Sequence, residues 1–239
     1  MTYDELVAEA VAVPLRGWDF GWLAGRATGS DPSWSYPDMA RALVARSTAV
    51  LDLDTGGGEL LASLGPLPPG TIATEGWEPN LAVARAVPGI DVRYAPDASL
   101  PVDSESVDLV LNRHGRLDAG EVARVLQSGG VLLTQQVGSD DCAEINAALG
   151  APPAYDRVWD AATATTRLTE AGLTVTDRIQ ERPDFVFHDV GALVFQLRAV
   201  AWQVPDFTVG KYEEALRRVH EQGEFRARSH RFLIRAQRP

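Results

Sequence analysis

Short apolar runs alternate with amphipathic segments through the middle of the chain. Runs rich in valine, leucine and alanine predict strands at residues 49–53, 71–74, 91–94, 107–111 and 131–136. Apolar positions three or four residues apart between these runs predict helices at 59–64, 78–87 and 119–126. Strands that alternate with helices indicate βαβ units with right-handed crossovers. The pattern therefore predicts a parallel sheet that is covered by helices on both faces.

The two ends of the chain carry looser patterns. Residues 4–13 and 37–46 predict helices before the first strand, and Pro37 stands in the first turn of the second helix, where proline is well tolerated. The C-terminal part predicts helices at 141–149, 155–171, 190–202 and 207–220, and strands at 173–179 and 229–235. No internal repeat, low-complexity tract or linker separates independent domains in this pattern.

The charge balance narrows the classes of partner. The 239 residues include 33 acidic and 22 basic side chains, which gives a formal net charge of −11. Binding a phosphate backbone relies on lysine and arginine to release counterions, so this balance argues against general nucleic-acid binding. It suits small neutral or cationic ligands, although an acidic surface also serves solubility.

Cysteine content and the N-terminus bear on cellular location. Cys142 is the single cysteine, so neither an intramolecular disulfide nor a cysteine-based zinc site can form. The N-terminal residues lack the basic and apolar regions of a signal peptide, and no run of about 18 apolar residues occurs. We therefore expect a cytoplasmic protein that uses no metal and does not enter a membrane.

A glycine-rich segment follows the first strand of the repeating pattern. Residues 54–58 read DTGGG and stand between the strand at 49–53 and the predicted helix at 59–64. Glycines at such a junction let a ligand approach the backbone closely, with helix N–H groups directed at it. A run of glycines is often only a flexible turn, but its position at the first βα junction favours a binding loop.

Two carboxylates follow the next two strands. Glu75 comes after the second strand, where an acidic side chain can accept hydrogen bonds from both hydroxyls of a ribose. Asp97 follows the third strand, where a carboxylate can accept from an adenine amino group. Each alone has an ordinary explanation, a solvent-facing glutamate or a loop aspartate. Because the carboxyl ends of consecutive strands meet at one crevice, loop and carboxylates together indicate a nucleoside-containing cofactor.

These motifs resemble those of class I methyltransferases that use S-adenosyl-L-methionine (SAM), particularly the broad type 11 group. The resemblance covers about residues 48–137. VLDLDTGGGE resembles the first motif, ATEGWEPNLAVAR the second, DASLPVDSESVDLVLNRH the stretch with the adenine contact, and EVARVLQSGGVLLTQQ the following helix, turn and strand. Asp54 departs from the pattern, since the family usually has glycine there, and its carboxylate could repel the SAM carboxylate or attract its cations.

The resemblance implies an α/β fold: a Rossmann-like three-layer sandwich with a mostly parallel seven-stranded sheet, helices on both faces and an N-terminal helical cap. We expect residues 1–48 to form this cap or lid. Residues 49–239 would form the SAM-binding domain, with a C-terminal elaboration on the substrate side. The implied cofactor contacts are Asp52, Asp54, Thr55, Gly56, Gly58, Glu75, Gly76, Trp77, Asp97, Ala98 and Asn112.

Residues beyond the fourth and fifth strands are candidates for the acceptor side. His114 is the candidate general base because its ordinary pKa of about 6.5 suits proton transfer. A histidine that lines the cofactor pocket is the alternative reading. Further candidates on the substrate side are Trp34, Tyr36, Gln136 and His188. The N-terminal aromatic residues either close over the cleft as a lid or pack on the sheet; they are Trp18, Phe20, Trp22, Trp34 and Tyr36.

The sequence therefore predicts a SAM-dependent methyltransferase with a small-molecule acceptor. One alternative is an RNA methyltransferase that uses the arginine-rich stretch 217–238, although solvated surface positions explain that stretch better. A second alternative is a protein that holds SAM without catalysis, which Asp54 and the uncertain base leave open. An NAD-linked oxidoreductase fits less well, because the segments after Asp97 follow the methyltransferase pattern.

Overall fold

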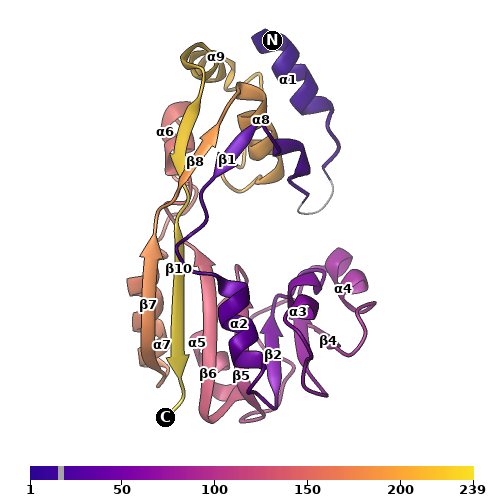
Figure 1. The fold of residues 1–239 in the computed structure, drawn as a ribbon. Helices are drawn as coiled ribbons and strands as arrows, with labels where there is room; N and C mark the ends of the chain where they lie inside the picture. Colours follow the sequence, from indigo (N-terminus) through magenta and orange to yellow (C-terminus); the bar gives the residue numbers. More distant parts are fainter. Residues whose placement is uncertain (16–18) are drawn as a thin grey trace. The chain divides into compact units, whose positions relative to one another are not determined.

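The computed structural model of the chain describes residues 1–15 and 19–239, which form two compact units (Figure 1). The large unit comprises Ser33–Val137, Trp159–Gln180 and Arg231–Pro239, and the small unit comprises Met1–Pro32, Gly138–Val158 and Glu181–His230. Each unit is therefore built from segments that are far apart in the sequence. Trp18, one of the predicted lid aromatics, lies outside the described residues.

A seven-stranded sheet organises the large unit. The first five strands in the order β4-β3-β2-β5-β6-β10-β7 are parallel to their neighbours, whereas β10 pairs antiparallel with β6. The strands are β2 (Val50–Leu53), β3 (Ile72–Glu75), β4 (Asp91–Tyr94), β5 (Val107–Arg113), β6 (Leu126–Val137), β7 (Thr174–Glu181) and β10 (Arg231–Gln237). The predicted mostly parallel sheet of seven strands is confirmed.

Helices cover both faces of this sheet, as predicted. Successive strand residues face opposite sides, so Leu109 belongs to one apolar core and Val110 to the other. The core that includes Leu109 contains residues from α2 (Tyr36–Val44), α3 (Glu59–Ser63) and α4 (Glu78–Ala84). The core that includes Val110 contains residues from α5 (Ala119–Val125) and α7 (Ala161–Glu170). Burial on both faces explains the continuous apolar runs of the parallel strands.

The small unit contains a short antiparallel sheet and helices around a core of its own. The sheet has the order β1-β8-β9, from β1 (Ala27–Gly29), β8 (Asp184–Phe187) and β9 (Phe225–Arg228). Its helices are α1 (Tyr3–Ala12), the 3-10 helix η1 (Gly21–Leu23), α6 (Ala143–Leu149), α8 (Val190–Ala199) and α9 (Glu213–Gln222). Phe20 and Trp22, two predicted lid aromatics, pack against Phe195 of α8 here.

Two predicted helices begin later in the structure than the apolar pattern indicated. The expected helix at 155–171 begins at Ala161, because Asp160 caps it by accepting a hydrogen bond from the Thr163 N–H. The expected helix at 207–220 begins only at Glu213. Phe207 precedes that helix and stacks on the Tyr212 ring. Its apolar side chain, which suggested a helix, therefore packs within the preceding loop.

The predicted N-terminal cap is divided between the two units. Met1–Pro32 belongs to the small unit, whereas the segment from Ser33 onward, with α2, packs in the large unit. A lid formed by residues 1–48 stays a prediction. Within the described ranges, no helix combines the length and apolar character that crossing a bilayer requires.

Candidate functional site

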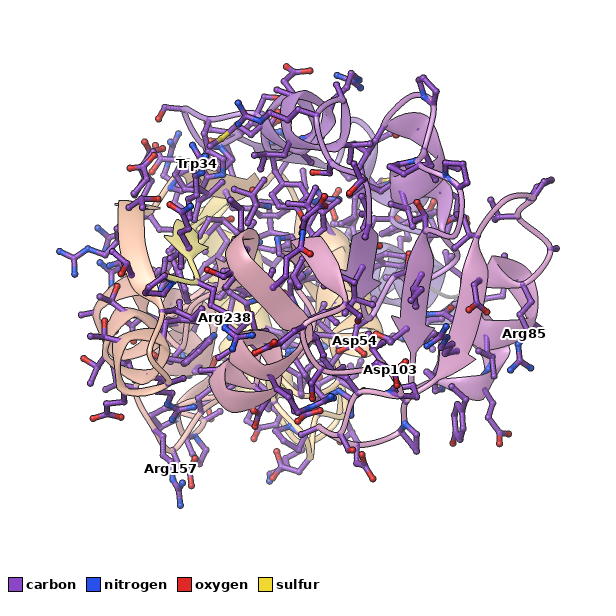
Figure 2. The ribbon with its side chains drawn as sticks, turned by 90° about the horizontal axis from the view of Figure 1, so that it is seen from below. Trp34, Asp54, Arg85, Asp103, Arg157 and Arg238 are labelled. Carbon is purple, nitrogen blue, oxygen red and sulfur yellow. The ribbon has the colours of Figure 1, made fainter. Side chains whose placement is uncertain are left out.

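The glycine-rich loop after β2 takes backbone conformations that only small residues adopt easily. Gly56 and Gly58 have φ angles of 66° and 84°, in the left-handed region that glycine enters without strain. Asp54, labelled in Figure 2, opens the loop with a φ of 50°. The Thr55 N–H donates to the Thr74 carbonyl at 2.9 Å, which fixes the loop against β3. An added Cβ on Gly56 would meet no atom within 4 Å, so its surface faces open space.

Glu75 at the end of β3 joins this loop to the next turn. Its carboxylate accepts hydrogen bonds from the Gly56 N–H at 2.8 Å and from the Trp77 N–H at 2.7 Å. Only 5% of Glu75 is exposed, so these are charge-assisted bonds in a sheltered position. The predicted ribose ligand therefore also shapes the protein around the crevice, and its removal would free two backbone donors.

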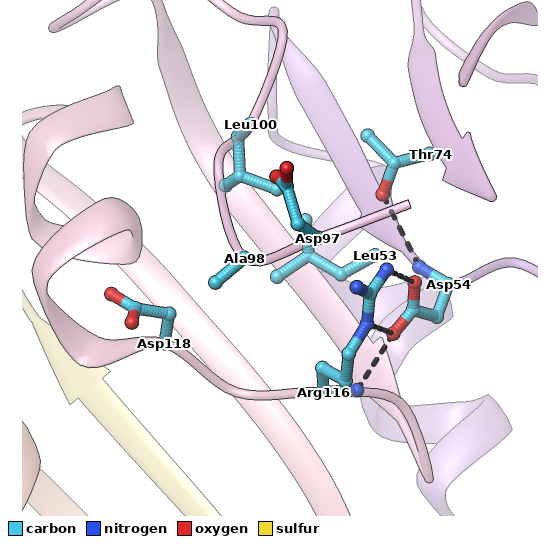
Figure 3. A pocket seen from close by; sticks show the side chains of 8 residues that line it. All are labelled: Leu53, Asp54, Thr74, Asp97, Ala98, Leu100, Arg116 and Asp118. Atoms are coloured by element: carbon cyan, nitrogen blue, oxygen red, sulfur yellow. Dashed lines mark hydrogen bonds and ion pairs between the residues drawn. The ribbon is translucent and has the colours of Figure 1, made fainter. Parts of the chain in front are cut away.

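Arg116 pairs with the unusual Asp54 (Figure 3). Its Nη2 and Nε donate to the two carboxylate oxygens of Asp54 at 2.9 and 3.2 Å, and its backbone N–H donates to the same carboxylate at 2.7 Å. Two parallel contacts between a guanidinium and a carboxylate form the bidentate arrangement that arginine favours. Sequence reasoning identified the anomaly of Asp54 and missed its partner.

The same guanidinium lies among the other residues predicted to hold a cofactor. Arg116 donates to the carbonyls of Ala95 and Pro96 at 2.6 and 2.8 Å. Its hydrogen bond with Asp54 raises its pKa, and the charges of Asp54, Asp97 and Glu75 add to that shift. The ends of β2, β3 and β4 thus place the three predicted carboxylates around one point, and Arg116 is directed at it.

Little space remains beside Arg116. The cavity in Figure 3 has a volume of about 20 Å³, room for about one water molecule. Its lining consists of Leu53, Asp54, Thr74, Asp97, Ala98, Leu100, Arg116 and Asp118. Gly76 allows this close packing, because a Cβ there would stand 2.6 Å from the Ala95 carbonyl and 2.8 Å from Arg116 Nη2.

A buried amide network holds the turn that carries Arg116. Gln136 Nε2 donates to Asn112 Oδ1 at 2.5 Å and to the Gly115 carbonyl at 3.2 Å. Asn112 Nδ2 in turn donates to the Arg116 carbonyl at 2.8 Å. Both amides are buried and committed to protein partners. Asn112 and Gln136, predicted to touch the cofactor and the acceptor, therefore position the turn after β5.

A chain of hydrogen bonds connects His114 to Trp34, which lies just before helix α2. Trp34 Nε1 donates to Gln135 Oε1 at 2.7 Å, and Gln135 Nε2 lies 2.9 Å from His114 Nε2. Because the amide oxygen receives the indole proton, the amide nitrogen donates and His114 Nε2 accepts. His114 is exposed as a residue, and desolvation of its ring, then the charges of Arg113 and Arg231, lower its pKa to about 3.

Solved structures with this architecture are numerous and share little sequence with the chain. A protein proposed to be a methyltransferase, from Bacillus halodurans C-125, is 19% identical, with a TM-score of 0.65 over 86% of this chain and 100% of that one. The cyclase SpnF is 18% identical, with a TM-score of 0.53 over 98% and 93% of the two chains. Geranyl diphosphate methyltransferase in complex with SAM is 15% identical, with a TM-score of 0.50 over 88% and 93%.

The chain has the fold of class I SAM-dependent methyltransferases. The predicted resemblance to that class is thus confirmed for the fold. No family model and no curated protein sequence matches the chain. At these identities the fold is what the likeness establishes, and the chemistry has to be argued from the site.

In this methyltransferase fold, Asp52 near the end of β2 and Tyr36 at the start of α2 offer groups suited to the amino-acid end of SAM. Burial raises the pKa of Asp52 to about 7, and a hydrogen bond from Thr55 opposes that rise. Tyr36 is 2% exposed, and its hydroxyl has no hydrogen-bond partner among the described residues. Burial, then the charge of Asp52, raises the pKa of this hydroxyl. An unpaired buried hydroxyl beside a carboxylate fits a polar ligand group, so the residues present suit SAM at this end.

The residues at the adenosine end suit SAM, but the room beside them is too small for an adenosine group in this arrangement of side chains. Asp97 accepts from the Ser99 N–H at 2.9 Å and keeps further acceptor capacity, and Trp77 has 52% of its surface exposed. Arg116 lies between Asp54 at the start of the glycine loop and the carbonyls of Ala95 and Pro96, which directly precede Asp97. Its side chain is 45% exposed, so it can turn outward without unfolding the crevice.

His188 belongs to the small unit, whereas the other predicted site residues belong to the large unit. Its Nε2 lies 2.7 Å from Thr28 Oγ1 and its Nδ1 lies 3.0 Å from Glu224 Oε1. Thr28 belongs to β1, Glu224 directly precedes β9, and His188 itself directly follows β8. These contacts give His188 a structural role there, and its predicted place beside an acceptor stays a prediction.

Proposed function

We propose that the protein is a SAM-dependent methyltransferase. The observation that carries the proposal is the convergence of the glycine loop, Glu75 and Asp97 at the ends of β2, β3 and β4. These three strands are neighbours in the sheet, and ligands of such sheets bind outside the carboxyl ends of the strands. The fold of class I methyltransferases supports the same reading.

Each of these residues would serve a different part of SAM. The cofactor supplies a methyl group on a sulfonium, an activated leaving group. Gly56 leaves the backbone open to the methionine part, and Asp52 offers a carboxylate to its ammonium. Asp97 can accept from the adenine amino group, and the exposed Trp77 ring can cover the base. By fixing the reacting groups in line, such a site can supply effective molarities of about 10⁵ M or more.

We propose a small-molecule acceptor rather than RNA. Within the arginine-rich stretch 217–238, five arginines each have an ion pair with a nearby acidic side chain. These pairs are Arg217–Glu213, Arg218–Glu214, Arg226–Glu224, Arg228–Glu144 and Arg238–Glu105. Arginines that are already paired have less charge to offer a phosphate backbone, where counterion release supplies affinity.

His114 fits a pocket-lining role better than the role of a base. With a pKa of about 3, its ring is neutral at physiological pH and accepts protons weakly. A base is needed only when the acceptor has to lose a proton before the methyl group arrives. We therefore propose that His114, held by Gln135 and Trp34, shapes the acceptor side of the crevice.

A SAM-binding protein without methyl transfer is the second candidate. The observation that favours it is Arg116, whose side chain occupies the crevice that the cofactor would fill. The likeness to SpnF, which is described as a cyclase, agrees with a fold that is compatible with other chemistry. This candidate predicts SAM binding without formation of S-adenosylhomocysteine, the demethylated product, whichever acceptor is offered.

Isothermal titration calorimetry tests the proposal directly. We expect SAM and S-adenosylhomocysteine to bind and NAD not to bind. Asp97→Asn should weaken both ligands about tenfold, since a hydrogen bond to a charged group contributes about 1.5–3 kcal/mol. The matched control is Asp103→Asn, an exposed carboxylate in the same connection that does not line the cavity (Figure 2).

The control and the product separate the outcomes of this experiment. Asp103→Asn should leave both affinities unchanged, and mass spectrometry should detect the demethylated product when SAM and a suitable acceptor are supplied together. Preference for NAD, or equal affinity of the Asp97 variant and the wild type for SAM, would contradict the proposed site.

A further inference from the structure

We propose that Arg116 competes with the adenosine part of the cofactor for the crevice, and that its ion pair with Asp54 holds the crevice closed. This inference rests on the proposed function, because it concerns the same site. It adds a residue that sets cofactor affinity from within the chain.

The first argument is that Arg116 uses the groups a nucleoside would use. Its guanidinium donates to the carbonyls of Ala95 and Pro96, the two residues directly before Asp97. The charges of Asp97 and Glu75, the predicted base and ribose ligands, act on it as well. A guanidinium and an adenine amino group are both N–H donors, so they satisfy the same acceptors and exclude each other.

The second argument is volume. The space left beside Arg116 is about 20 Å³, whereas ligand pockets usually measure roughly 300–1,000 Å³. A Cβ added to Gly76 would stand 2.8 Å from Arg116 Nη2, so the guanidinium already lies in contact with this wall of the crevice. An adenosine group cannot enter while Arg116 keeps this position.

The third argument is that Arg116 can leave. Its side chain is 45% exposed, so turning into solvent exchanges protein acceptors for water at small cost. The bidentate contact with Asp54, whose side chain is 20% exposed, opposes this movement. If the closed arrangement is populated about nine-tenths of the time, the apparent affinity for the cofactor falls about tenfold.

The experiment compares two variants with a matched control. Arg116→Ala removes the guanidinium, and Asp54→Gly removes its anchor at a position where a φ of 50° suits glycine. Arg41→Ala removes another exposed arginine that pairs with an aspartate at 2.6 Å, within helix α2. The probe is S-adenosylhomocysteine, which has no net charge at neutral pH, and the measurement is calorimetry at 50 and 500 mM NaCl.

We expect Arg116→Ala to bind the probe about five- to tenfold more tightly than the wild type at 50 mM salt. Asp54→Gly should bind more tightly by a smaller factor, because the carbonyl contacts of Arg116 remain. Arg41→Ala should match the wild type. Salt should raise the affinity of the wild type, since it screens the ion pair, and should leave Arg116→Ala unchanged.

The outcomes distinguish this inference from the proposed function. If the wild type binds the probe and Arg116→Ala binds it with equal or weaker affinity, the competition is overturned and the cofactor site is retained. Binding by Arg116→Ala alone supports both proposals. Absence of binding by every folded variant, checked by circular dichroism, overturns the proposed function and the competition together. If Arg116→Ala does not fold, Asp54→Gly decides: tighter binding supports the competition, and unchanged or weaker binding contradicts it.

Discussion

Asp52 and Asp54 stand two residues apart at the end of β2, and their surroundings differ sharply. Asp54 has a bidentate arginine, whereas Asp52 is desolvated beside a tyrosine hydroxyl that has no partner. The pKa of Asp52 is raised to about 7, so the carboxylate is largely protonated in the folded protein under mildly acidic conditions. Its charge costs stability when it forms without a ligand.

Asp52→Asn tests this cost. The folded protein binds more protons at Asp52 than the unfolded chain between pH of about 4 and 7, so stability falls as pH rises through that window. The asparagine variant lacks this decline, and its free energy of unfolding relative to the wild type should rise from pH 4.5 to pH 8. Urea denaturation at several pH values measures it, with Asp103→Asn as control. A constant difference would show that Asp52 is not destabilised by burial.

Arg116 shows where reading single residues fell short. The sequence marked Asp54 as unusual, and an acidic residue inside a crevice calls for a basic partner. Arg113 ends the adjacent strand β5 and Arg116 follows it, so the signal was present. Only the turn geometry selects Arg116. A Cβ added to Gly115 would stand 2.7 Å from the Asp54 Cβ, so the turn before Arg116 passes directly beside Asp54.

At the scale of helices and strands, the sequence predicted the elements that have a strong apolar pattern and missed those that lack one. The strands β2, β3, β4 and β5 were predicted to within two residues of their true bounds, whereas β6 begins at Leu126, ahead of the predicted strand at 131–136. The strands β1, β8 and β9 were missed. β2, β3 and β4 are as short, but they recur in the strand–helix alternation of the large unit, whereas β1, β8 and β9 lie outside that repeating pattern. The late start of α7 has a local cause, the cap at Asp160, that an apolar count does not detect.

Asp160→Ala should show what that cap contributes. Its carboxylate accepts from the Thr163 N–H at 2.7 Å, and the loss of such a cap costs about 0.5–2 kcal/mol. We expect the free energy of unfolding to drop by about 1 kcal/mol in urea denaturation. Glu170→Ala, an exposed change in the last turn of α7, should have little effect. Equal stability of both variants would mean that α7 does not depend on this cap.

At the scale of the whole molecule, the sequence predicted one compact unit well and the other poorly. The large unit follows the order of βαβ repeats, so its topology follows from handedness and burial rules. The small unit assembles Met1–Pro32 with segments after Gly138 and Glu181, and no local pattern indicates such long-range partners. The predicted boundary at residue 48 and the role of a lid stay predictions.

The central claim is that the ends of β2, β3 and β4 form one site for an adenosine-containing ligand. Nuclear magnetic resonance of the 15N-labelled protein during titration with S-adenosylhomocysteine tests it most directly. The account predicts saturable shifts of the Gly56, Trp77 and Ser99 amides, whose hydrogen bonds involve the loop and both carboxylates, with β7 amides such as Thr176 unmoved. Saturation that leaves Gly56, Trp77 and Ser99 unshifted, or no response at all, would contradict it.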